Sequence, residues 1–109
     1  MTQEWLQAVR ESFVHDAVYY SRHARHEMED EEFGRIFEQQ VYEAVNNAEV
    51  IEEYPDDTPY PSKLLFGETA ANERPLHVLC AYDAEDGLVV VITVYEPDPA
   101  RWIEYRRRR

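Results

Sequence analysis

Cysteine and long apolar runs are the two clearest shortages of this 109-residue sequence. Cys80 is the only cysteine, so no internal disulfide can form, and its apolar neighbours favour a small core side chain over a reactive thiol. The N-terminal stretch lacks a basic segment followed by an apolar run, and no apolar run approaches membrane-spanning length. We therefore expect a cytoplasmic protein with no membrane partner.

Basic residues are also scarce. Eleven Lys and Arg residues stand against 23 Asp and Glu residues, which gives a formal net charge of −12 at pH 7. A field of this sign repels nucleic-acid phosphates and anionic lipids, so RNA is disfavoured as a partner. Four of the basic residues form the tail Arg106–Arg109, and a local basic patch must therefore come from a few arginines.

The motifs of common cofactor enzymes are missing as well. We find no nucleophile elbow, P-loop, dinucleotide fingerprint or paired-cysteine motif, so no cofactor is expected. His23 and His26 lie three apart with Glu27 beside them, but this order matches neither zincin pattern. A metal site there is one alternative, and a solvated helix face is the interpretation that we favour.

The remaining composition is that of one packed domain. Hydrophobic residues make up 44% and aromatic residues 13% of the chain, which is typical of a globular rather than a disordered protein. A chain of this length supports one core but not two comfortable ones. We expect a single domain, residues 1–109, with a helical extension over 1–16 and a basic tail over 106–109.

Apolar residues at helical spacing predict helices in the N-terminal half. Thr2 can cap the first helix and Ser21 the second, while Gly34 breaks the chain before the third and Asn47 would end it in the left-handed conformation. The apolar stripes are Trp5, Leu6, Val9 and Phe13 in the first helix, Ala24 and Met28 in the second, and Ile36, Phe37, Val41, Ala44 and Val45 in the third.

Period-two patterns predict strands in the C-terminal half. Asp86-Gly87 predicts a turn that pairs the last two strands as a hairpin, and Asp98 with Pro99 predicts a short C-terminal helix. The fold class is therefore α+β, with N-terminal helices packed on one face of a small antiparallel sheet of three to four strands. Strand candidates are a short segment at 17–21 and the segments 49–54, 62–67, 75–82 and 88–96.

His77 is the unexpected residue, because it interrupts the apolar segment 75–82. If Tyr82 pairs with Leu88 across the turn, His77 pairs with Thr93 on the face turned away from the helices. A one-residue bulge would change these partners. The candidate site on this face comprises His77, Thr93, Tyr95 and Arg74, the last from just before the strand, with Glu52 or Tyr54 beside them depending on the register.

Two interpretations of this site remain open. In the structural one, which we favour, the imidazole is half-buried and hydrogen-bonded to Thr93 or to a tyrosine. In the functional one, His77 is a general acid or base, Arg74 clamps a phosphate and Tyr95 donates a hydrogen bond. Both interpretations predict a hydrogen-bonded imidazole.

Four segments carry a family resemblance: SRHARHEM, NNAEVIEEYPDDTPYPSKLLFG, RPLHVLCAYD and VITVYEPDPARW. Together they resemble the bacterial domain-of-unknown-function family 4258 over residues 17–105. Members of that family are more distantly similar to small toxins of the RelE and BrnT type, in which N-terminal helices pack on an antiparallel sheet. By this resemblance, His23, Arg74, His77 and Tyr95 would be the catalytic candidates around an RNA substrate.

Two features depart from that pattern. The segment between Met28 and Val41 is longer than usual and carries the acidic run Glu29–Glu32, and the net charge is unlike that of an RNA-binding toxin.

Two functions follow as hypotheses. The first is a metal-independent, toxin-like ribonuclease of a toxin-antitoxin system, which requires Arg74 beside His77 and a neutral or basic pocket. The second is a non-catalytic interaction module that binds a protein partner, antitoxin-like or basic, through its acidic surface. Self-association as a homodimer, through a sheet edge or the first helix, is a third option.

Overall fold

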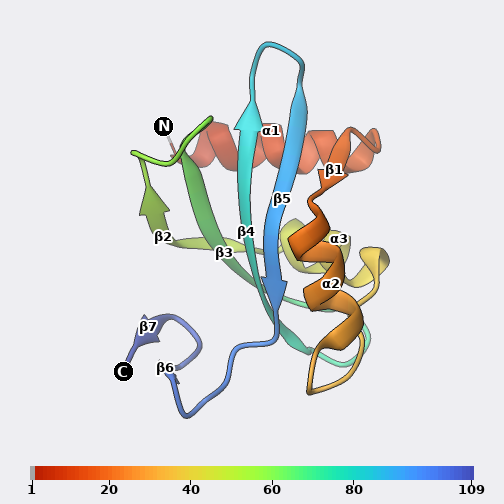
Figure 1. Ribbon diagram of the computed structural model, residues 1–109, viewed down its shortest axis with the longest axis vertical. Helices are drawn as coiled ribbons and strands as arrows, with labels where there is room; N and C mark the ends of the chain where they lie inside the picture. The colour runs from red at the N-terminus through yellow and green to blue at the C-terminus, as the bar shows by residue number, and fades with distance from the viewer. Residues whose placement is uncertain (1) are drawn as a thin grey trace.

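The computed structural model describes residues 2–109 as helices packed on one face of a sheet (Figure 1). The helices are α1 (Thr2–Val14), α2 (Arg22–Asp30) and α3 (Glu38–Asn46). The five strands lie in the order β1 (Val18–Tyr20), β5 (Leu88–Tyr95), β4 (Pro75–Asp83), β3 (Ser62–Glu68) and β2 (Glu49–Tyr54). Among the strands of residues 2–109, only β1 and β5 pair in parallel. The α+β class is confirmed, with five strands in the sheet instead of three to four.

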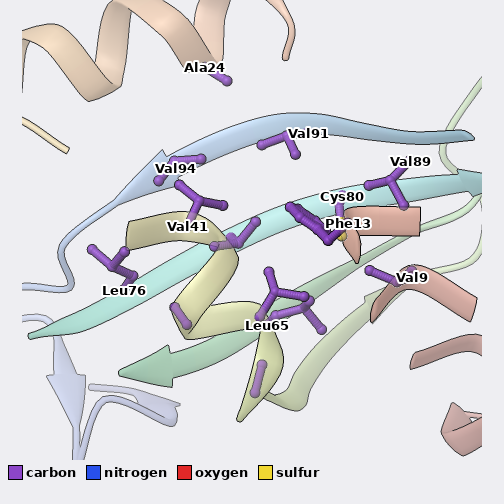
Figure 2. Close-up of a cluster of buried hydrophobic side chains, with 14 of the residues drawn as sticks. Val9, Phe13, Ala24, Val41, Leu65, Leu76, Cys80, Val89, Val91 and Val94 are labelled. Atoms are coloured by element: carbon purple, nitrogen blue, oxygen red, sulfur yellow. The ribbon is translucent and has the colours of Figure 1, made fainter. Parts of the chain in front are cut away.

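The hydrophobic core lies between the helices and the sheet (Figure 2). The predicted helix stripes supply most of its helical side, and Trp5 packs against it while partly buried. Each fully buried aliphatic side chain contributes on the order of 1.5–3 kcal/mol, so this layer holds the helices on the sheet. The sheet contributes, among others, Leu65, Leu76, Val78, Cys80, Val89, Val91 and Val94.

Ser21 caps α2 as predicted. Its hydroxyl accepts a hydrogen bond from the Ala24 amide at 3.0 Å and also donates to the Ile92 carbonyl at 3.0 Å. One side chain therefore satisfies a free amide at the helix start and fixes α2 against β5.

The predicted register of the last two strands is wrong, although the hairpin itself is confirmed. Tyr82 pairs with Val89 instead of Leu88, which shifts the register by one residue, and a bulge at Ile92 shifts it by one more, so the partner of His77 is Tyr95 instead of Thr93. The Asp83 carboxylate accepts from two turn amides, which extends β4 by a residue before the chain reverses. Near the turn, the core side of β5 is consequently occupied by Val89 and Val91.

The third helix also begins and ends differently from its prediction. Gly34, with φ of 112°, breaks the chain as expected, but Phe37 precedes the helix and is exposed. Asn47 is not left-handed, since its φ is −118°. Its side-chain amide instead bonds the carbonyls of Glu43 and Glu68, so a tertiary contact replaces the local cap.

The predicted C-terminal helix is replaced by a small hairpin of β6 (Trp102–Ile103) and β7 (Arg107–Arg108), which lies at the end of the sheet away from α1 (Figure 1). Asp98 starts one helical turn, because its carbonyl accepts from the amides of Arg101 and Trp102. The turn does not continue, since Trp102 is buried against the sheet and two residues with positive φ, Glu104 and Tyr105, reverse the chain.

In residues 2–109, every helix is too short or too polar to cross a membrane.

Candidate functional site

His77 lies on β4, on the sheet face opposite the helices, and is fully buried. Its Nε2 is 2.6 Å from the carbonyl oxygen of Tyr105, and its Nδ1 is 3.0 Å from the hydroxyl of Tyr95. Because a carbonyl oxygen only accepts, Nε2 carries the proton and donates, and Nδ1 accepts from the Tyr95 hydroxyl. Both ring nitrogens are therefore occupied within the protein.

Burial determines the charge of this imidazole. Desolvation lowers the pKa of His77 to about 4, against which the hydrogen bond with the Tyr105 carbonyl acts only in part. Burial also raises the pKa of Tyr95 to about 12, so its phenol stays protonated and can donate. At neutral pH the pair is an uncharged, satisfied hydrogen-bond network.

Aromatic rings enclose His77 on several sides. The ring centroids of Trp102, Tyr95 and Phe66 lie 4.5, 5.2 and 5.9 Å from that of His77, all with edge-on geometry. Such packing leaves no opening through which a substrate could approach the imidazole. His77 is a buried structural link between Tyr95 and Tyr105.

Arg74 is not part of this cluster. Its Nε lies 2.5 Å from Glu96 Oε1, and its other nitrogens donate to the carbonyl oxygens of Gly34 and Arg35. Those carbonyls belong to the segment between α2 and α3, on the helical side of the sheet. The structure thus joins His77 to Tyr95 and holds Arg74 on the opposite face.

A groove of about 700 Å³ opens between α2 and the C-terminal hairpin. It brings together two of the predicted candidates, His23 and Tyr95, with two arginines that the sequence analysis did not select, Arg101 and Arg108. Its carboxylates outnumber its basic groups, so the neutral or basic pocket expected for a ribonuclease is absent from it. The remaining lining residues are His26, Glu27, Asp30, Glu31, Glu32, Phe33, Glu96, Asp98 and Trp102.

His23 is exposed and lies 3.3 Å from Glu27, one turn farther along α2. The same Glu27 oxygen accepts the Val94 amide at 3.0 Å, so the carboxylate bridges α2 and β5. Partial burial raises the pKa of Glu27. In residues 2–109, no three His, Cys, Asp or Glu side chains are placed to hold a metal ion together.

Glu52 and Tyr54 do reach the second face of the sheet, beside the hairpin. Arg108 donates to both Glu52 oxygens, at 2.9 and 3.1 Å, and the Tyr54 hydroxyl donates to the same carboxylate. Desolvation opposes ionisation of Glu52, but the hydrogen bonds from Arg108 and Tyr54 outweigh it and lower its pKa. The position of Arg108 followed from no sequence pattern, because it depends on the fold of the tail.

The structure is that of a small α+β domain. Its segment from β1 to β5 is preceded by α1 and followed by the C-terminal hairpin of β6 and β7. A family model described as a domain of unknown function, DUF4258, matches residues 20–96, which is more than half of the chain. The chain belongs to this family, as the resemblance predicted. No curated protein and no solved structure matches it.

Proposed function

We propose that this chain is a non-catalytic module that binds a basic protein partner through its acidic surface. The observation that carries the proposal is the use of the two central catalytic candidates as structural groups. His77 is buried with both nitrogens engaged, and Arg74 is neutralised by Glu96 on the opposite face. In this arrangement neither side chain is within reach of an external phosphate.

The negative net charge favours a basic protein as the partner. The net charge of −12 attracts basic surfaces over a Debye length and disfavours nucleic acid. The groove adds contact chemistry, because the exposed carboxylates of Asp30 and Glu32 adjoin Phe33, whose side chain is 47% exposed. An apolar contact rimmed by carboxylates suits a partner that presents basic side chains around an apolar residue.

Affinity purification of the tagged, full-length protein from its native cell tests the proposal. We expect a stoichiometric basic partner whose recovery falls as the salt concentration rises. The variant Asp30→Lys/Glu32→Lys should lose this partner. The control Glu4→Lys/Glu11→Lys makes the same change of charge on exposed α1 positions and should retain it. Recovery of no stoichiometric partner at low salt would contradict the proposal.

A ribonuclease that pairs Arg74 with His77 is not proposed, because the two side chains lie on opposite faces of the sheet. A toxin-like ribonuclease built on His23 is the second candidate, and one observation favours it. The groove is lined by the exposed His23 and by Tyr95, Arg101 and Arg108, of which Tyr95 also bonds His77 and Arg108 also bonds Glu52. In this hypothesis His23 is the general acid or base for RNA cleavage, and the two arginines contact the phosphate of the RNA backbone. Growth arrest and RNA cleavage on induced expression, both absent in His23→Ala, would favour it. Unchanged growth and intact RNA with the wild type would exclude it in that host.

A further inference from the structure

The C-terminal segment 97–109 is a separate small unit lying on the second face of the sheet. β6 and β7 pair only with each other, and the backbone–backbone hydrogen bonds of residues 98–109 are made within the segment. The segment also lies outside the family match, which ends at residue 96. It is therefore attached to the family core through side chains, in the manner of a bound peptide.

Trp102 is the apolar anchor of this segment. Its side chain is 5% exposed and its ring meets His77 edge-on, with 4.5 Å between the centroids. The Tyr105 carbonyl accepts from His77 Nε2, and the Tyr105 ring lies 5.8 Å from that of Phe66. The sheet supplies an apolar surface, which includes Phe66, and one hydrogen-bond donor, His77 Nε2, for these groups.

Two arginines of the segment are each held between a carboxylate and an aromatic ring. Arg106 Nε lies 2.6 Å from Glu49, and its guanidinium carbon lies 4.8 Å from the centre of the Phe66 ring. Arg108 forms a bidentate pair with Glu52 and lies 4.7 Å from the centre of the Trp102 ring. The guanidinium group is the cation best suited to this combination of a fork-shaped ion pair and a stacking contact.

We infer that the sheet face formed by Glu49, Glu52, Phe66 and His77 is a binding site for an arginine-rich protein segment that carries an aromatic residue. The chain's own residues 97–109 occupy it as an intramolecular competitor. This inference rests on the proposed function, because the basic partner supplies the segment that exchanges with the hairpin. Exchange, rather than simple opening, is required since a bare face would expose the large apolar surface that Trp102 covers.

A labelled synthetic peptide of residues 97–109 is the probe, and fluorescence anisotropy with the full-length protein is the measurement. The attached hairpin is present at an effective concentration on the order of millimolar, so wild type should bind the peptide weakly. The exposed pair of substitutions Arg106→Gln/Arg108→Gln weakens the attached hairpin and should bind it about tenfold more tightly or better. Adding Glu49→Gln/Glu52→Gln to that variant should abolish binding.

Two controls accompany the measurement. Arg22→Gln/Arg35→Gln removes the same charge from exposed positions outside this face and should bind like wild type. A peptide in which both corresponding arginines are glutamine should bind no variant. Thermal unfolding of each variant confirms that the sheet is intact. Equal affinity of wild type and Arg106→Gln/Arg108→Gln for the peptide would overturn the inference.

Failure of this inference and failure of the proposed function give different results. Tight peptide binding without any partner in the affinity purification would refute the proposed function and leave the binding site standing. A recovered partner that the peptide does not displace, and that binds wild type and Arg106→Gln/Arg108→Gln equally, would refute the site and leave the protein-binding function standing.

Discussion

His77 Nε2 lies 2.6 Å from the carbonyl oxygen of Tyr105 and joins the middle of the sheet to the turn of the C-terminal hairpin. The partners are 28 residues apart in sequence. Since the carbonyl can only accept, the contact also selects the tautomer whose Nδ1 receives the Tyr95 hydroxyl. The presence of His77 among the apolar residues of β4 is thus explained by its hydrogen bonds with Tyr95 and Tyr105.

Replacing His77 by Ala should destabilise the fold strongly. The change removes two hydrogen bonds, leaves the Tyr105 carbonyl without its donor and opens a cavity among aromatic rings, at a cost of about 3 kcal/mol. Tyr95→Phe removes only one hydrogen bond and should cost about 1 kcal/mol. Urea unfolding followed by far-UV circular dichroism measures both. Equal midpoints for the two variants and the wild type would contradict the assigned network.

The pH dependence of stability should carry the signature of His77. Its pKa is about 4 in the folded protein against an ordinary value of 6.5, so between these values the unfolded chain binds a proton that the native state excludes. The unfolding free energy should therefore be fully retained above pH 6.5 and fall by about 3 kcal/mol as the pH drops towards 4. Below that pH the contribution of His77 levels off.

His77→Gln supplies the control for this titration, because the carboxylates titrate alike in both proteins. The difference in unfolding free energy between wild type and His77→Gln should change across this pH window. Nitrogen chemical shifts of the imidazole at pH 7 should independently report a neutral ring protonated at Nε2. A pH-independent difference together with a charged ring at pH 6 would refute the assignment.

The parts of the fold that local patterns determine were predictable. The helix stripes, the Ser21 cap and the strand segments depend on neighbours a few residues away. The structure confirms them, except that Phe37 of the third stripe precedes α3 and is exposed. The register of β5 was not predictable, because it follows from the Asp83 turn contacts and from the Ser21 hydroxyl, which bonds the carbonyl of the bulged residue Ile92.

The part of the candidate site that strand alternation determines could be predicted, and the part that tertiary contacts determine could not. Strand alternation placed His77 and Tyr95 on one face and predicted a hydrogen-bonded imidazole, as found. Alternation alone cannot place Arg74, which precedes the strand and turns towards Glu96 and the carbonyls of Gly34 and Arg35. The burial of His77 depends on Trp102, whose position required tertiary contacts to override the helical signals at Asp98 and Pro99.

Arg74→Ala should destabilise the fold rather than remove an activity. The guanidinium pairs with Glu96 and donates to two carbonyls between α2 and α3, so its loss leaves several acceptors unsatisfied at a cost of about 2 kcal/mol. Arg74→Lys should restore little of this, because an ammonium cannot span the three acceptors. Arg22→Ala, on the exposed side of α2, should change stability by less than about 0.5 kcal/mol. Thermal unfolding compares the three variants, and equal midpoint temperatures for all of them would refute this role of Arg74.

Gly67 of β3 should tolerate no side chain, because α3 approaches it directly. A Cβ built on Gly67 would lie 1.9 Å from the carbonyl oxygen of Ala44 and 2.7 Å from its carbonyl carbon. Both are backbone atoms, so relief requires α3 to move off the sheet, and Gly67→Ala should cost about 3 kcal/mol or more. A Cβ on Gly87 would have no atom within 4 Å, so Gly87→Ala should cost only the strain of a side chain at φ of +60°, about 1 kcal/mol. Denaturant midpoints compare the two variants, and a Gly67→Ala midpoint at or above that of Gly87→Ala would show that α3 does not pack this closely on β3.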